Sequence, residues 1–313
     1  MRALLLRRAG LALLLMLAAS ALTFAIVTAA PGNVAALIAE RAAGAGADAE
    51  MIKRFEEELG LNDPLPVRYG NWLRSAATGD LGVSLRTGKP ISQEFAERIP
   101  VTAALLAGGG VLALLMSLGF GIAGAASNGG IVDRFLHAVA LVGASTPNFF
   151  VAAVLVIVFS VMLRWVPTFG ISSFSSWFLP WFTIGLFPAS VLARVVRVNL
   201  QEAMSRPFAT TGFAKGLTRW QVLLREALPN ILIPYMTTFG AQFTLMVIGA
   251  IVVETVFALR GIGSFFIDAI RFRDFVGMQA VLLLFVVFFV TVNLIVDIMA
   301  IFADPRLRRP RRA

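Results

Sequence analysis

Long stretches without a charged side chain alternate with short polar stretches along the chain. No Asp, Glu, Lys or Arg occurs in Ala9–Ala39, Ile99–Val132, Trp165–Ala193, Ala227–Val253 or Phe275–Val296, and Phe135–Leu163 contains only the ionisable His137. A helix of about 20 apolar residues crosses the roughly 30 Å of bilayer hydrocarbon and pairs its own backbone polar groups there. The pattern therefore predicts an all-α integral membrane protein with six transmembrane helices.

We place one span in each of these runs. The spans are Ala9–Ala29, Pro100–Ala126, Phe135–Leu163, Trp177–Val196, Ile231–Val256 and Ala280–Phe302. The first run could also be a signal peptide, but its apolar stretch exceeds the usual core of about 7–15 residues, so we interpret it as a retained helix. Pro147, Pro180 and Pro188 are positioned to kink spans three and four.

Composition supports a membrane protein and excludes several kinds of chemistry. Of the 313 residues, 58% are hydrophobic and 14% charged, whereas a soluble domain has about 25% charged residues. The net charge of +9 could suggest nucleic-acid binding, but basic residues also flank membrane spans on the cytoplasmic side. With no cysteine and one histidine, the sequence predicts no catalytic residue and no metal site.

The basic residues predict the orientation of the spans. They gather before span one, between spans two and three, between spans four and five, and after span six: Arg2, Arg7, Arg8, Arg134, Arg194, Arg197, Arg206, Lys215, Arg219, Arg225 and five arginines from Arg306 to Arg312. Arg260, Arg271 and Arg273 lie on the opposite side. The summed bias places both termini in the cytoplasm of a cell inner-membrane protein.

This orientation divides the chain into four parts. We expect an N-terminus with the first helix (1–30), an extracytoplasmic segment (31–99), a five-helix core (100–303) with a cytoplasmic loop (199–230), and a basic cytoplasmic tail (304–313). Within the outer segment, Ala49–Leu59 is predicted to form a short amphipathic helix that ends at Gly60. In span two, Gly108-Gly109-Gly110 would allow another helix, of this chain or a partner, to approach closely.

The cytoplasmic loop is predicted to contain a short helix. Pro207 suits its first turn and Gly216 its end. Trp220 and Leu224 then follow at a spacing that places them on one helix face. Apolar residues on such an exposed loop need a surface, which could be that of a partner protein or of the membrane.

The loop resembles that of permeases of binding-protein-dependent ABC importers, whose pattern is Glu-Ala-Ala, then Gly, then Ile-x-Leu-Pro. Gly216 and Leu228-Pro229 align with the family glycine and Leu-Pro, while Thr210-Thr211-Gly212 and Glu226 stand in place of Glu-Ala-Ala and Ile. Over nearly its whole length the chain is similar to the peptide/nickel group, of the dipeptide and oligopeptide B-subunit type. The matching motifs are Pro31-Gly32, Leu59 to Tyr69, Gly79 to Ser84, Arg98 to Thr102, Ala214 to Leu217, Glu254 to Phe257, Gly261 to Gly263, Arg273-Asp274, Asn293 to Asp297 and Asp304 to Arg306.

The resemblance implies a type I ABC importer permease and its partners. A binding protein would deliver peptides to the outer face of two permeases, usually two different ones, and two cytoplasmic ATPases would use ATP and Mg²⁺. Nickel complexes and glutathione-like or opine-like solutes use similar permeases. The ATPase-coupling loop would comprise Phe208, Ala209, Thr211, Gly212, Phe213, Ala214, Lys215, Gly216 and Leu217.

The chain itself lacks a site for ATP hydrolysis. Its nearest approach to a phosphate-binding loop is Gly88-Lys89-Pro90, in which Val83 replaces the upstream glycine and Pro90 replaces the hydroxyl residue. We therefore expect no cofactor on this chain and no enzymatic role, with ATP hydrolysed by separate subunits.

Few ionisable or amide side chains fall inside the spans. Glu254, Asn293 and Asp297 could line the solute path or a gate. Alternatively, Glu254 could lie at the interface and Asp297 could pair with Arg194 or Arg197.

Two other classes of membrane protein compete with the importer permease. A self-sufficient secondary transporter usually shows internal repeats and ionisable residues at the bilayer midplane, which this sequence lacks. An intramembrane hydrolase needs paired groups, but His137 and Ser145 would lie roughly 12 Å apart along one helix.

Overall fold

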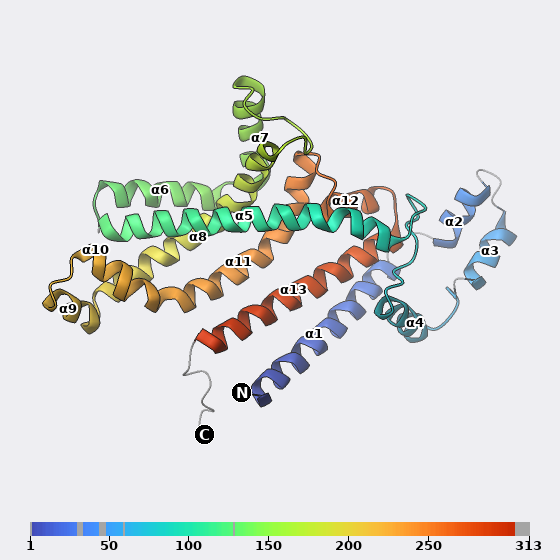
Figure 1. Ribbon diagram of the computed structural model, residues 1–313. Coiled ribbons are helices and arrows are strands. Elements are labelled where there is room, and N and C mark those ends of the chain that lie inside the picture. The colour runs from blue at the N-terminus through green and yellow to red at the C-terminus, as the bar shows by residue number, and fades with distance from the viewer. Residues whose placement is uncertain (1, 30–33, 44–47, 59, 128, 304–313) are drawn as a thin grey trace. The chain divides into compact units, whose positions relative to one another are not determined.

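The computed structural model describes residues 2–29, 34–43, 48–58, 60–127 and 129–303 (Figure 1). The Pro31-Gly32 motif, Leu59 and the basic tail 304–313 lie outside this part of the chain. The chain divides into two compact units. Residues 1–9, 100–264 and 291–313 form the first unit, and residues 10–99 and 265–290 form the second.

The regular elements of the described residues are helices joined by turns and loops, and the only β-structure among these residues is an isolated antiparallel bridge between Val83 and Pro90. Five of the predicted spans are confirmed as helices long and apolar enough to cross a membrane. They lie in α1 (Arg2–Ala29), α5 (Ile91–Ser127), α8 (Phe178–Met204, extended by the turn η3, Phe174–Trp177), α11 (Leu228–Val256) and α13 (Phe275–Ala303). The chain is therefore an all-α integral membrane protein.

The third predicted span is not one straight helix. It consists of α6 (Ile131–Ser145) and α7 (Asn148–Leu155), which continues as the π-helical segment η2 (Val156–Met162), and the two parts are bent by 108°. Thr146 is extended, with φ −92° and ψ 124°, because the ring of Pro147 disfavours a helical residue before it. The chain has six crossings if this bent pair forms one of them.

Close helix packing in the first unit depends on the three glycines of α5. A Cβ atom added to Gly108 or Gly109 would clash with Trp181 or Ile184 of α8, and one on Gly110 would lie 3.1 Å from Phe243 of α11. The helices that approach these glycines are thus α8 and α11 of the same chain.

An ion pair that the sequence did not predict joins α6 to α8. The Arg197 guanidinium donates two hydrogen bonds to the Asp133 carboxylate, one of them at 2.7 Å. Gly129 N–H adds a third at 3.0 Å, and Asp133 is almost completely buried. Loss of one partner would leave a buried charge without compensation, so the pair fixes the start of α6 against α8.

In the second unit, α1 packs against α4 (Leu65–Ala77). The Tyr69 hydroxyl lies 2.8 Å from the Ser20 hydroxyl, and the ring of Phe24 contacts those of Tyr69 and Trp72. Earlier in the outer segment lie α2 (Val34–Ala43) and α3 (Ala49–Glu58), and α3 confirms the predicted amphipathic helix.

The buried carboxylate of Asp274 joins two further segments of the second unit. Asp274 accepts hydrogen bonds from the Ser84 hydroxyl at 2.5 Å and from the N–H groups of Leu85 at 3.1 Å and Gly277 at 2.9 Å. It thereby ties the turn after the Gly79–Ser84 motif to the start of α13. The preceding helix, α12 (Ile262–Arg271), was not predicted from the sequence.

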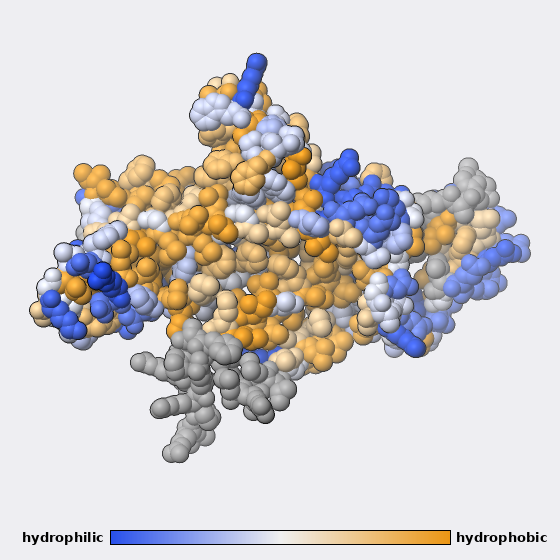
Figure 2. All heavy atoms as spheres, in the orientation of Figure 1, coloured by the Kyte–Doolittle hydropathy of each residue, from blue (hydrophilic) through white to orange (hydrophobic). Residues whose placement is uncertain are grey.

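The surface of the first unit changes character along its length. Most atoms on the visible faces of α5 and α11 belong to hydrophobic residues, whereas hydrophilic residues gather around α9 (Pro207–Ala214) (Figure 2). Apolar helix surfaces of this kind suit lipid, and the polar end suits water or a headgroup region.

Candidate functional site

The predicted loop helix is present as α9 (Pro207–Ala214). Arg206 precedes it in an extended conformation and Pro207 occupies its first turn, where the missing N–H has no helical partner to lose. Gly216 has φ +81°, a left-handed conformation that ends the helix and that glycine adopts without steric penalty.

One face of α9 is buried against the chain that follows it. Ala209 and Gly212 are buried, and a Cβ atom on Gly212 would lie 3.1 Å from Val222. Val222 begins the π-helical segment η4 (Val222–Ala227), which runs directly into α11. The small residue at position 212 therefore allows α9 to lie closely on the start of the fifth span.

The turn between α9 and η4 is rigidly capped. Thr218 and Gln221 exchange side-chain and backbone hydrogen bonds of 2.9 and 3.3 Å around the short helix α10 (Arg219–Gln221). Trp220 is 51% exposed, whereas Leu224 packs against the core. The two residues do not share one environment as their spacing suggested, because η4 departs from the α-helical period between them.

A hydrophobic cluster connects this loop to two membrane helices. Its buried members include Leu200 of α8, Leu223 of η4 and Tyr235 of α11, and Phe208 of α9 packs against it. The α9 helix is consequently attached to the C-terminal end of α8 and the N-terminal end of α11, and a displacement of α9 would act on both helices.

The opposite face of α9 is exposed. It presents Thr211, Phe213, Ala214, Lys215 and Gly216, while Leu217 is half-buried. Phe213 is 44% exposed at the hydrophilic end of the unit. A phenyl ring in this position suits contact with another protein surface or with the membrane interface.

Glu254 lies at the centre of a polar clasp among α5, α11 and the start of α12. It is fully buried, accepts a hydrogen bond from the Thr102 hydroxyl at 2.6 Å, and accepts another from Ser264 N–H at 2.9 Å. The Thr102 hydroxyl in turn accepts from Ile262 N–H at 2.8 Å. These hydrogen bonds connect α5 and α11 to the start of α12, the helix that follows α11 in the chain.

The Gly261-Ile-Gly263 motif makes room for this clasp. A Cβ atom on Gly261 would clash with the Glu254 carboxylate, and one on Gly263 would lie 2.6 Å from the backbone of Ile251. The motif and Glu254 thus form one structural element. The role of Glu254 in the solute path stays a prediction.

The other two predicted path residues lie on α13. Asn293 is exposed and is separated by one turn from Asp297. The side chain of Asp297 lies outside the described part of the structure. Arg197, one of the partners considered for Asp297, pairs with Asp133, and the pairing of Asp297 stays a prediction.

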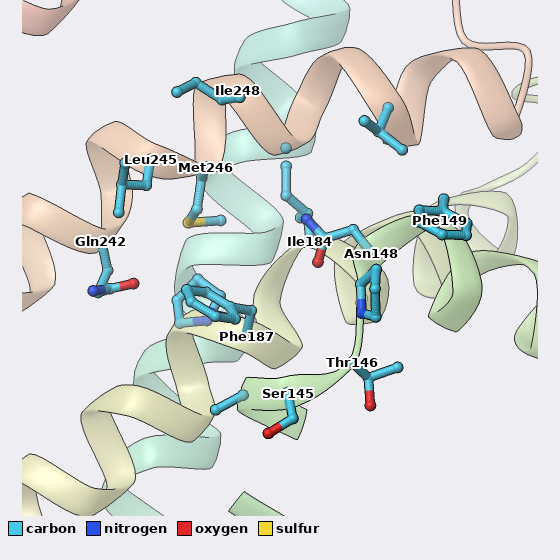
Figure 3. Close-up of a pocket in the computed structure, with 15 residues that line it drawn as sticks. Ser145, Thr146, Asn148, Phe149, Ile184, Phe187, Gln242, Leu245, Met246 and Ile248 are labelled. Carbon is cyan, nitrogen blue, oxygen red and sulfur yellow. The ribbon is translucent and has the colours of Figure 1, made fainter. Parts of the chain in front are cut away.

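A cavity of about 430 Å³ opens in the first unit at the break between α6 and α7. Residues on both sides of the break line it, together with α8 and α11 (Figure 3). Its wall contains Thr146 and Asn148 from the break, Phe187 from α8, and Gln242 and Met246 from α11. Neither Glu254 nor Asn293 is among its lining residues.

The sequence analysis predicts only part of this cavity. It predicts a kink at Pro147, but it does not identify Asn148 and Gln242, the amide side chains of the wall. An uncharged amide within a long apolar run is the feature that could have identified them, because it is polar without interrupting the run.

Two family models match this chain, one in its N-terminal part and one in the remainder. Residues 116–309 match the family described as "Binding-protein-dependent transport system inner membrane component". Residues 1–106 match the family of N-terminal parts of membrane components of the same kind of transport system.

Several curated proteins are similar over nearly their full length. A putative peptide transport system permease protein of Brucella abortus is 36% identical, and the match covers 98% of this chain and 99% of the relative. The probable peptide ABC transporter permease protein y4tP of Sinorhizobium fredii is 35% identical, covering 91% and 92%. The glutathione transport system permease protein GsiC of Escherichia coli is 36% identical, covering 92% and 93%.

A solved structure has a similar fold. A chain of the MetNI methionine ABC transporter, in inward-facing conformations, aligns with 68% of this chain and 98% of its own length. The TM-score is 0.57 at 16% sequence identity, so this similarity concerns the fold alone.

Proposed function

Since the chain belongs to the family of inner-membrane components of binding-protein-dependent transport systems and is a permease subunit of an ABC importer, we propose that its solute is a peptide or a small peptide-like molecule such as glutathione. The names of its full-length relatives carry this proposal, because both peptide and glutathione permeases share about a third of its residues.

The permease works with three kinds of partner in this proposal. An extracytoplasmic binding protein delivers the solute, a second permease completes the path, and two ATPase subunits bind the inner face. The exposed Phe213 on α9 supports an ATPase partner, because a half-exposed phenyl ring beside Lys215 suits a cleft of another protein. ATP and Mg²⁺ bind to the ATPase subunits, and this chain hydrolyses nothing.

The α9 helix is the proposed mechanical input. It lies on η4 through Gly212 and on the hydrophobic cluster through Phe208. Because α9 is joined to α8 and α11 by buried contacts and by a capped turn, closure of the ATPases would move those helices as rigid bodies. The solute path would then open to one side or the other.

Both termini and the 199–230 loop face the cytoplasm in this proposal, and 31–99 faces outward. The basic residues near Arg206 and Lys215 support this orientation. The ATPases, which need cytoplasmic ATP, would meet α9 on that side.

Reconstitution tests this function. Vesicles that contain the chain with its co-purified subunits are expected to import radiolabelled trialanine or glutathione only when ATP is supplied on the α9 side and the binding protein on the other. The chain alone should import neither probe under a proton or sodium gradient. Gradient-driven uptake by the chain alone would identify a secondary transporter and overturn the proposal.

A further inference from the structure

The cavity lies where a membrane span loses its helical backbone. Thr146 is extended, and the lining residues run through the break from Ala144 to Phe149. Non-helical backbone at membrane depth is tolerated only where it is buried in protein or lines a hydrated cavity. The break therefore suits a site that is buried in protein or lines a hydrated cavity.

The wall of the cavity is polar without being charged. None of its lining residues is Asp, Glu, Lys, Arg or His, and its polar side chains are those of Ser145, Thr146, Asn148 and Gln242. The Thr146 hydroxyl already donates to the carbonyl of Val142 at 2.7 Å. The two amide side chains are thus the groups best suited to a ligand that both donates and accepts hydrogen bonds.

Gln242 has a buried acceptor that the protein does not satisfy. Its Oε1 atom is excluded from solvent and has no hydrogen-bond partner among the described residues. Figure 3 shows this oxygen directed toward the other lining residues. A buried carbonyl oxygen without a donor is a strong place for a ligand N–H.

Asn148, the first residue of α7, supplies a second amide beside Gly249 of α11. Its Nδ2 atom would lie only 2.8 Å from a Cβ atom on Gly249, so the absence of a side chain at position 249 makes room for it. Gln242 and Gly249 are seven positions apart on α11, so their Cα atoms are roughly 10 Å apart along the helix axis. An extended peptide covers this distance with about three residues.

We propose that this cavity binds the uncharged middle of a translocating peptide. Gln242 Oε1 accepts a hydrogen bond from a backbone N–H of the solute, and Asn148 Nδ2 donates to a backbone carbonyl. Phe187, Leu245 and Met246 contact its side chains. Charged peptide ends lie outside the cavity, because nothing in its wall would neutralise them.

This inference rests on the proposed function and makes it more specific. It assigns recognition to the backbone amide that all peptides and glutathione share, which would allow one permease to pass solutes of different sequence. A lipid chain would use only the apolar wall, and a side chain of the second permease would make Gln242 an assembly residue. The experiment separates these occupants.

The test uses the importer assembled with its own subunits in vesicles. Uptake of penta-alanine, whose uncharged middle can span the two amides, is compared with that of penta-alanine methylated at its two central amide nitrogens, which removes the N–H donors there. The ratio of the two kcat/KM values is measured for the wild type and for Gln242→Met, which has similar length but no amide. The same binding protein is used with the wild type and with Gln242→Met. Its own preference for one peptide over the other therefore contributes equally to the two ratios.

We expect Gln242→Met to lower the preference for the unmethylated peptide about ten-fold, as loss of one buried hydrogen bond predicts. Gly249→Ala, which displaces the Asn148 amide, should lower penta-alanine uptake about as much. Gln279→Met is the control, because Gln279 Nε2 is also buried without a partner among the described residues but the residue does not line the cavity. This control should retain the wild-type ratio.

Other outcomes would overturn the inference. An unchanged ratio in Gln242→Met, with or without lower uptake, would show that Gln242 does not contact the solute amide. Loss of the co-purified second permease in this variant would assign Gln242 to assembly. If the wild type imported no peptide and no glutathione, the proposed function itself would fail.

Discussion

Replacing Phe213 by glutamate is expected to reduce ATP-driven uptake at least ten-fold while the chain still inserts and its membrane helices still pack. The ring is 44% exposed on α9 and lies away from the buried Ala209–Gly212 face. Loss of an apolar contact of about 1.5–3 kcal/mol weakens docking by roughly ten- to a hundred-fold. Uptake and ATPase activity measured in the same vesicles would show hydrolysis that no longer drives transport.

Phe213→Leu is the matched control for this variant. It keeps an apolar side chain at the same position and should retain most of the uptake. Gly216→Glu should also uncouple transport, because a side chain at φ +81° is strained and alters the end of α9. Normal coupled uptake by Phe213→Glu would refute the assignment of α9 as the coupling helix.

Thr102→Val is expected to destabilise the first unit more than other changes of the same size. The substitution preserves shape but removes the hydroxyl that donates to Glu254 and accepts from Ile262 N–H. Each buried polar group that loses its partner costs about 1–3 kcal/mol. The midpoint of thermal unfolding of the purified protein in detergent should therefore fall by several degrees.

Thr255→Val provides the comparison, because it makes the same chemical change on an exposed position of α11. The Thr255 hydroxyl bonds only to the carbonyl of Ile251 in its own helix, at 2.7 Å. Its midpoint should stay within about one degree of the wild type. Equal shifts for the two variants would show that the clasp around Glu254 contributes little stability.

The membrane helices could be predicted from the sequence because lipid imposes a strong and local constraint. A charge-free run such as Phe275–Val296 has few ways to satisfy its backbone except as a helix, and α13 covers it. The α9 helix could be predicted for a similar reason, because two residues close together in the sequence, Pro207 and Gly216, fix its ends.

Features that depend on contacts between distant residues were not predictable in the same way. The Asp133–Arg197 pair joins residues 64 positions apart, and Glu254 meets Thr102 across 152 positions. Periodicity carries no information on such pairings.

The bend at Pro147 shows how a local signal can be underestimated. The proline predicts a kink in span three, but the sequence does not specify the size of the bend. The 108° bend follows because Thr146 leaves the helical conformation altogether. The cavity then depends on where α8 and α11 pack beside the break, which no single run of sequence specifies.

Cross-linking from α9 tests the central claim, that this helix engages an ATPase subunit, most directly. The chain has no cysteine, so a single cysteine can be placed at Phe213 or, for comparison, at Arg164 beyond η2. A thiol-reactive photo-cross-linker attached at position 213 is expected to capture the ATPase subunit in native membranes, whereas position 164 should not. Capture from position 164 instead, or labelling of position 213 by an impermeant reagent outside intact cells, would contradict the account.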